Sequence, residues 1–419
     1  MPFPAFPRRP AVANDALPRR RSRPPVPPRP PARRRRAGAP ATAFAFVLLA
    51  AALVPSIAPS AHAAPLPAPP QLSATSYLLI DHVSGETLAA KDPDKRVEPA
   101  SLTKIMTAYL VAAELARGSV TLDEPVIISE AAQAMPGSRM FVEAGKTVPL
   151  GELLRGLIIQ SGNDASVALA EHIAASEQGF VDMMNRMADS LGMTGTSYAN
   201  ASGLPHPDHY TTARDLGTIA RAMIRDFPDV YALYSEREFV HNGIAQKNRN
   251  ALLWRDDSVD GMKTGHTEAA GYCLVSSAVR DGMRLISVVL GTASDKTRIA
   301  ESQRLLNYGY RFFRTERIYA AGEPIQEARL WMGRQETIPL GVEEDLWLTL
   351  PRDAFDTLES RIEVSDYIEA PVRIGETLGR SVIRSGDEMV REVPLLALQK
   401  VEEGSIFLRM KHSIMRHFQ

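Results

Sequence analysis

Three short segments contain residue types that can carry out acyl transfer. In the first, Ser101 precedes Lys104 by three positions. On a helix these two side chains share a face. A serine hydroxyl is a poor nucleophile until a neighbour takes its proton, and a buried lysine kept neutral by a second cation can do so. The spacing predicts a nucleophile and its base, although one Ser-x-x-Lys alone is also typical of a helix surface pair.

The second and third segments supply complementary groups. Ser161-Gly162-Asn163 offers a hydroxyl that can relay a proton and an amide that can bind a peptide carbonyl, although alone it is typical of a turn with a helix cap. Lys263-Thr264-Gly265 suits a strand edge along which a substrate peptide lies, with positive charge near Lys104 and near a substrate carboxylate. Alone it would be read as a turn. Ser-x-x-Lys and Lys-Thr-Gly each occur once, in the order found in penicillin-binding proteins and serine β-lactamases.

Longer phrases strengthen the resemblance. Residues 98–107 (EPASLTKIMT), 160–165 (QSGNDA), 209–215 (HYTTARD) and 262–267 (MKTGHT) resemble those of low-molecular-mass penicillin-binding proteins, the D-alanyl-D-alanine carboxypeptidases. The likeness runs from about Ser76 to the C-terminus. It implies an α+β fold: a catalytic domain of the β-lactamase/transpeptidase type, with an antiparallel sheet flanked by helices, then a small all-β domain and an amphipathic membrane tail.

The resemblance also implies residue roles. Ser101 would be the nucleophile, Lys104 the base, and Ser161 and Asn163 the opposite wall. The substrate-binding residues would be Lys263, Thr264, Gly265, Thr267 and Arg298, the last either holding the substrate's terminal carboxylate or being a solvated helix charge. The backbone N–H groups of Ser101 and His266 would form the oxyanion hole, the His266 side chain serving for packing. The implied substrates are stem peptides ending in D-Ala-D-Ala, and β-lactams would be inhibitors.

Hydrophobic periodicity predicts the elements that must position these residues. Residues 76–80 and 86–88 form a predicted hairpin, as do residues 271–279 and 283–290. Helices are expected from Ser101 to Gly118, over 150–159, over 165–175 with Asn163 or Asp164 as the cap, and over 294–313. Beyond about residue 318, short β-rich runs such as 346–350 and 370–374 alternate with turns.

These patterns predict four regions. Residues 1–63 are a basic leader that contains a signal peptide, with an apolar stretch at 41–54 and a small-x-small cleavage site at 61–63. Residues 64–318 form the catalytic domain, residues 319–402 the β domain, and residues 403–419 an amphipathic helix that lies on a membrane surface. An uncleaved anchor helix at 41–54, or a tail packed on protein, remains open. We expect an exported protein on the periplasmic face of the inner membrane.

Charge and composition narrow the function further. The leader's eleven Arg and one Asp give +10, so a net charge of −1 for the whole chain leaves −11 for the remainder, which does not favour nucleic acid. The nine scattered His predict no metal site, and we expect no cofactor. The single cysteine, Cys273, excludes an intrachain disulfide.

A β-lactamase is less favoured because no Glu-x-x-x-Asn phrase follows shortly after Asn163. A catalytically silent wall-binding scaffold is disfavoured by the intact Ser101, Lys104 and Lys263.

Overall fold

The computed structural model describes residues 66–407, 409 and 410. The predicted leader and signal peptide lie outside these residues, as does most of the predicted tail helix. In the described part of that tail, Ile406, Phe407, Arg409 and Met410 are helical, but residues 403–405 are not, and Glu403 forms an isolated bridge with Gly333; the helix therefore starts later than the predicted residue 403. Within the described residues, no helix is both long enough and apolar enough to span a membrane.

A five-stranded antiparallel sheet with the order β2-β1-β9-β8-β7 organises the first part of the chain. Its strands are β1 (Ser76–Asp81), β2 (Thr87–Lys91), β7 (Val259–Thr267), β8 (Gly271–Arg280) and β9 (Met283–Thr292). Both predicted hairpins are confirmed, and β1 pairs with β9 although some 200 positions separate them. β7 is an edge strand, so one side of its backbone has no neighbouring strand.

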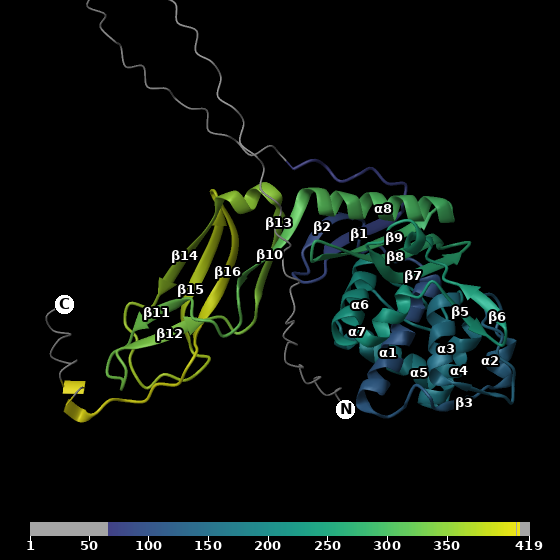
Figure 1. Ribbon diagram of the computed structural model, residues 1–419, viewed down its shortest axis with the longest axis horizontal. Coiled ribbons are helices and arrows are strands. Elements are labelled where there is room, and N and C mark those ends of the chain that lie inside the picture. Colours follow the sequence, from purple (N-terminus) through teal and green to yellow (C-terminus); the bar gives the residue numbers. More distant parts are fainter. Residues whose placement is uncertain (1–65, 408, 411–419) are drawn as a thin grey trace, which may run out of the picture. The chain divides into compact units, whose positions relative to one another are not determined.

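Helices cover both faces of this sheet (Figure 1). Helix α8 (Asp295–Phe312) packs on β8 and β9, and its N-cap is Ser294, whose side chain accepts a hydrogen bond from the Thr297 N–H. Helix α6 (Ala213–Asp226) contacts β1 and β9. Because helices pack on both faces of the sheet, β8 and β9 are rich in apolar residues, and their central residues are buried.

A helical cluster fills the space beside α6, with α1 (Lys104–Arg117) at its centre; residues 104–113 of α1 are all buried. The other elements of this part are α2 (Glu130–Ala134), α3 (Leu150–Arg155), α4 (Asn163–Ala174), α5 (Glu177–Ser190), α7 (Pro228–Tyr231) and two small hairpins, β3 (Pro125–Ile127) with β4 (Thr147–Pro149) and β5 (Glu238–His241) with β6 (Ile244–Lys247).

Two helix predictions require correction. The helix expected over 150–159 is α-helical only to Arg155 and continues as one π-helical turn to Gln160. The helix expected from residue 165 begins at Asn163 and has Gly162 at its N-cap, so neither Asn163 nor Asp164 is the cap. Instead, the Asp164 carboxylate accepts hydrogen bonds from the backbone N–H groups of residues 140, 141 and 142, which fastens a separate loop to α4.

The β-rich part begins directly where α8 ends. β10 (Phe313–Tyr319) pairs with β13 (Leu346–Pro351), and a second five-stranded sheet has the order β11-β12-β16-β15-β14. Its strands are β11 (Gln326–Arg329), β12 (Thr337–Gly341), β14 (Leu358–Val364), β15 (Thr377–Ser385) and β16 (Glu388–Ala397). The predicted boundary at residue 318 thus falls inside a strand. The run 370–374 is not a strand, because Pro371 lacks an N–H and only Val372 forms an isolated bridge, to Val401.

Candidate active site

Ser101 lies on a single 3-10 turn, Ala100–Thr103, immediately before α1. The expected helix therefore starts as a tighter turn and becomes α-helical at Lys104. The i, i+3 relation still aligns the two side chains, because a 3-10 turn places such residues above one another. The Lys104 Nζ lies 3.1 Å from the Ser101 Oγ, within the range for direct proton transfer.

The Lys104 amine is held by two further acceptors. Its Nζ lies 2.7 Å from Asn163 Oδ1 and 2.5 Å from the Ser202 carbonyl oxygen, and its side chain is 1% exposed. The pKa of Lys104 is lowered to about 7, chiefly by burial; the Asp164 carboxylate opposes this shift, and the positive charge of Arg249 adds to it. Near neutral pH much of this lysine is therefore the free amine that a general base must be.

Ser161 and Asn163 lie at the junction between the π-helical turn and α4. Ser161 has a left-handed backbone (φ 66°), and its buried hydroxyl has no hydrogen-bond partner among the described residues. A buried hydroxyl without a hydrogen-bond partner lowers the stability of the fold, and groups that carry such a cost are typical of functional sites. The Asn163 Nδ2 donates to the Pro136 carbonyl at 2.6 Å, so one of its two N–H bonds remains for the expected peptide carbonyl.

The Lys-Thr-Gly segment lies on the edge strand β7, as predicted, with Lys263 and Thr264 buried. Burial holds the pKa of Lys263 well below its usual range, and the charges of Lys104, Arg249 and Arg298 add to this effect. At Gly265, a Cβ atom would lie 3.1 Å from both the Pro99 carbonyl oxygen and the Leu102 Cγ. Glycine therefore lets β7 approach the turn that carries Ser101.

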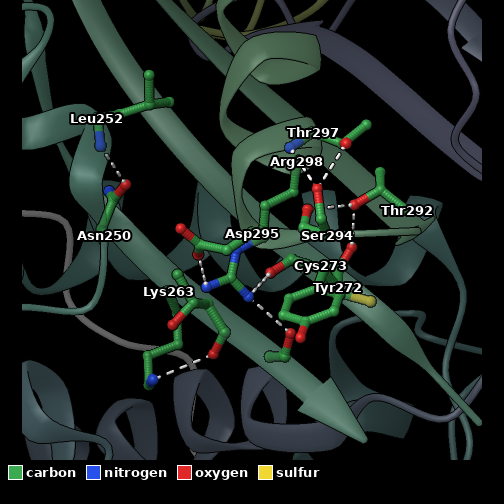
Figure 2. Close-up of polar contacts among 12 residues, drawn as sticks. Asn250, Leu252, Lys263, Tyr272, Cys273, Thr292, Ser294, Asp295, Thr297 and Arg298 are labelled. Carbon is green, nitrogen blue, oxygen red and sulfur yellow. Dashed lines mark hydrogen bonds and ion pairs between the residues drawn. The ribbon is translucent and has the colours of Figure 1, made fainter. Parts of the chain in front are cut away.

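Arg298 projects from the first turn of α8 toward β7 and β8 (Figure 2). Its Nη1 donates to the Gly265 carbonyl at 3.0 Å and to the Cys273 carbonyl at 3.2 Å, and its Nη2 pairs with Asp295. The side chain is 6% exposed. Arg298 is thus a buried cation behind the Lys-Thr-Gly segment and not a solvated helix charge.

His266 and Thr267 complete the end of β7. The His266 ring is exposed and lies 4.0 Å from the Tyr272 ring, centroid to centroid, which fits a packing role for the imidazole. The Thr267 Oγ1 donates to Glu98 Oε2 at 2.9 Å. This hydrogen bond joins the end of β7 to the segment that precedes Ser101. The structure thus brings the predicted residues of all three segments together near Ser101.

Comparison with known proteins decides the family. Residues 63–294 match the family described as D-alanyl-D-alanine carboxypeptidase, and residues 313–403 match the C-terminal domain of penicillin-binding protein 5. The chain is 40% identical to D-alanyl-D-alanine carboxypeptidase DacA of Escherichia coli (strain K12) over 350 aligned residues. The alignment covers 82% of this chain and 87% of that protein. The chain belongs to the D-alanyl-D-alanine carboxypeptidase family.

Solved structures agree with this assignment. The structure of penicillin-binding protein 5 from Haemophilus influenzae superposes on this chain with a TM-score of 0.77 and 40% sequence identity. The superposition covers 80% of this chain and 99% of the Haemophilus chain. Penicillin-binding protein D2 of Listeria monocytogenes, solved in an ampicillin-bound form, superposes with a TM-score of 0.53 and 29% sequence identity. The superposition covers 57% of this chain and 98% of the Listeria chain. The chain therefore has the penicillin-binding protein 5 fold, with its catalytic domain and C-terminal all-β domain.

Several residues that shape this carboxypeptidase site were not identified by the sequence. His209 is buried, and its Nε2 lies 2.8 Å from the Thr103 Oγ1, while its Nδ1 accepts from the Ala199 N–H. Burial lowers its pKa to about 4, so the ring is neutral near pH 7 and donates to Thr103 through Nε2. The phrase 209–215 contained this histidine, but a single His in a loop has no periodicity that indicates its partner.

Arg249 and Gly203 were also missed. The Arg249 Nε donates to the Gln160 carbonyl at 2.8 Å, which holds its charge where it acts on both active-site lysines. Gly203 has φ +88°, and a Cβ there would lie 1.8 Å from the Ala100 carbonyl oxygen. Nothing in the local sequence indicates either approach, because each joins segments that are far apart along the chain. Within the described part of the chain, no cluster of three or more His, Cys, Asp or Glu could hold a metal ion.

Proposed function

We propose that this carboxypeptidase removes the terminal D-alanine from peptidoglycan stem peptides through an acyl-enzyme on Ser101. The observation that carries the proposal is the 3.1 Å separation between the Ser101 Oγ and the buried amine of Lys104, whose pKa is lowered to about 7. A hydroxyl next to a neutral amine is an activated nucleophile. The family membership supplies the substrate class.

The proposed reaction has two steps. The Lys104 Nζ takes the proton of Ser101 as its oxygen attacks the carbonyl carbon between the two terminal D-alanines. The oxyanion is stabilised by the backbone N–H groups of Ser101 and His266, each worth roughly 3–4 kcal/mol in the transition state. The proton on Lys104 passes to the leaving nitrogen, D-alanine departs, and water then attacks the ester and frees Ser101.

The remaining groups act on the substrate. The peptide lies antiparallel along the edge of β7, and Lys263, Thr264 and Arg298 provide donors and positive charge for its terminal carboxylate. An entering carboxylate favours the charged form of Lys263, whose pKa the empty site depresses. Asn163 donates its remaining N–H to a substrate carbonyl, and the Ser161 hydroxyl relays protons between the active-site amines and the leaving group.

β-Lactams are attacked by the same serine and leave a slowly hydrolysed adduct, which agrees with the ampicillin-bound form of the similar Listeria protein. Replacing Ser101 by Ala should abolish both D-alanine release from a soluble pentapeptide and the mass increase on incubation with penicillin. Both are measured by mass spectrometry. If the variant still forms a penicillin adduct, another nucleophile is responsible.

Export and membrane attachment are further proposals. The apolar stretch 41–54 and the cleavage site at 61–63 direct the chain across the inner membrane, so that the mature protein begins at Ala64. The tail helix then attaches it to the periplasmic face of that membrane. In support, Ile406, Phe407 and Met410 are 67%, 81% and 61% exposed, although buried positions are usual for such side chains.

Removal of residues 405–419 tests the attachment. We expect the truncated enzyme to leave the membrane fraction, with unchanged activity on a soluble pentapeptide. A matched variant, Phe407→Ser, should weaken binding to anionic vesicles without abolishing it, because a single apolar side chain contributes about 1.5–3 kcal/mol. A truncated protein that still sediments with membranes, or that loses activity on the soluble peptide, would refute the proposed anchor.

A further inference from the structure

A buried carboxylate on α8 has no part in the mechanism proposed above. Glu301 lies three positions after Arg298 on this helix and is 4% exposed. Among the described residues it forms no ion pair, and its two oxygens instead accept three hydrogen bonds from residues 66–74, which we call the strap. A carboxylate is taken out of water at a high cost unless such donors meet it. Glu301 is therefore matched to the strap.

The strap is tied to α8 at two points. Glu301 Oε1 accepts from the Ser73 N–H at 2.7 Å and from the Ser73 hydroxyl at 2.6 Å, and Oε2 accepts from the Ala74 N–H at 3.0 Å. Two turns further along the helix, the Tyr308 hydroxyl donates to the Pro67 carbonyl at 2.9 Å. The strap thus runs beside α8 before the chain enters β1 (Figure 1).

The composition of the strap suits this role. Prolines at 67, 69 and 70 restrict its backbone, so the segment loses little conformational entropy when it is fixed along the helix. Leu72 packs against the apolar core that α8 shares with the sheet. Because prolines cannot donate hydrogen bonds, the polar attachment is left to the residues that follow them, which are those bound by Glu301.

The residue after the strap leads to Arg298 by a second path. The Thr75 N–H donates to the Leu290 carbonyl at 2.9 Å, and the Thr75 hydroxyl donates to the Gly291 carbonyl at 3.3 Å. The Gly291 N–H in turn donates to the Cys273 Sγ at 3.5 Å. The Cys273 carbonyl is one of the two that bind the Arg298 guanidinium. The same stretch of chain therefore contacts both the helix that carries Arg298 and the strands that hold its side chain.

The turn of α8 that contains Glu301 has few other polar contacts. Ser302 is buried, as are Ser276 on β8 and Ser287 on β9, which pair opposite each other. None of these three hydroxyls has a hydrogen-bond partner among the described residues. Within residues 299–303, Glu301 is the one side chain with a described hydrogen bond to another part of the chain. The strap is thus the polar attachment of this turn.

We propose that Glu301 is a positioning residue, which clamps the strap onto α8 and thereby directs the Arg298 guanidinium at the terminal carboxylate of the substrate. Glu301 itself touches no substrate. Binding groups must be held within a fraction of an ångström of the productive geometry, so a helix turn that shifts weakens the contact made by its arginine. This inference rests on the proposed function, in which Arg298 binds that carboxylate.

Two variants of the full chain open the clamp from opposite sides. Glu301→Ala removes the acceptor, and Ser73→Pro removes an N–H and a hydroxyl from the exposed strap while α8 keeps its sequence. Each should lower kcat/KM for a soluble D-alanyl-D-alanine pentapeptide about tenfold, mainly through KM, and that for an ester without a carboxylate by less than about twofold. Gln71→Pro is the matched control, because the Gln71 N–H makes no hydrogen bond among the described residues. We expect it to change neither value.

Hydrogen exchange followed by mass spectrometry measures the clamp directly. The Ala74 amide should exchange faster in both clamp variants than in the wild type, and at the wild-type rate in Gln71→Pro. Thermal unfolding shows whether each variant is folded. If Glu301→Ala does not fold, Ser73→Pro carries the test, since its substitution lies on the surface.

A double-mutant cycle separates positioning from general support of the fold. In an Arg298→Ala background, Glu301→Ala or Ser73→Pro should leave the peptide-to-ester ratio of kcat/KM unchanged, because the guanidinium that the clamp directs is gone. A further fall of the ratio in that background would overturn the inference. So would equal losses on both substrates in the single variants, or a ratio that Ser73→Pro does not change.

The same measurements show which proposal fails. If Arg298→Ala alone lowers the ratio and the clamp variants do not, the inference about Glu301 is wrong and the proposed function stands. If Arg298→Ala lowers activity on both substrates equally, Arg298 does not bind the carboxylate, and the role of Glu301 falls with it. A wild-type enzyme that releases no D-alanine would refute the proposed function itself.

Discussion

Lowering the pH from 8 to 5 should slow the acylation of Ser101 by penicillin about 90-fold, because the neutral form of Lys104 is the base. A group with a pKa of about 7 is about 90% neutral at pH 8 and about 1% neutral at pH 5. Only the deprotonated amine of Lys104 can accept the Ser101 proton, so the acylation rate falls as the pH falls through the pKa of Lys104. An unperturbed lysine would instead give a tenfold rise per pH unit with no plateau below about pH 10.

The assay is stopped-flow fluorescence with a labelled penicillin at subsaturating concentration, from pH 5 to pH 9.5. The second-order rate constant should reach a plateau above pH 8. His209 does not account for such a transition, because its pKa of about 4 lies below the range. A midpoint above pH 9, or a rate independent of pH between 5 and 8, would refute the assignment of Lys104 as a base with a depressed pKa.

Substitution of Arg249 provides a second test of the pH dependence of acylation. Its charge lowers the pKa of Lys104, so Arg249→Gln should move the midpoint to higher pH and slow acylation most near neutral pH. Arg304→Gln is the matched control, because that exposed arginine makes no interaction with either active-site lysine in the described structure. Equal midpoints in the two variants would show that Arg249 does not tune Lys104.

Two further substitutions test the rest of the site. Arg298→Ala should lower kcat/KM for D-alanyl-D-alanine peptides about 10- to 100-fold more than for simple esters that lack a carboxylate, as expected for the loss of a charge-assisted hydrogen bond; equal losses on both substrates, measured side by side, would remove Arg298 from carboxylate binding. Gly203→Ala should slow penicillin labelling by at least about tenfold, because the new Cβ would lie 1.8 Å from the Ala100 carbonyl oxygen and displace Ser101. Gly192→Ala, which also has a positive φ but has nothing within 4 Å of the new Cβ, is its control, and similar labelling rates in the two variants would contradict the argument.

Local patterns in the sequence were sufficient for several of the elements that carry the site. The hairpin β8–β9 follows from two apolar runs around an Asp-Gly turn, and the start of α8 follows from Ser294 and Asp295, which are residue types preferred at helix N-caps. The pairing of Ser101 with Lys104 follows from helical spacing alone. In each case the interacting residues are close in sequence, so their geometry depends on a few backbone dihedral angles.

Tertiary packing decided the features that depend on residues far apart in the sequence, which local sequence patterns do not indicate. The sequence placed the start of α4 at residue 165, but the helix begins at Asn163, where the Asn163 amide meets Lys104 and the Asp164 carboxylate binds the loop at residues 140–142. Likewise, Gly265 is required because β7 presses against the turn of Ser101.

The chemical state of the site also belongs to the tertiary structure. A lysine in sequence has a pKa near 10.4, and only burial beside Arg249 brings that of Lys104 to about 7. The sequence by itself determined which residues could react, that Ser101 and Lys104 align, and that Lys263 lies on a strand, since those properties are local. The folded chain decided which distant groups surround them, because desolvation and charge depend on neighbours in space.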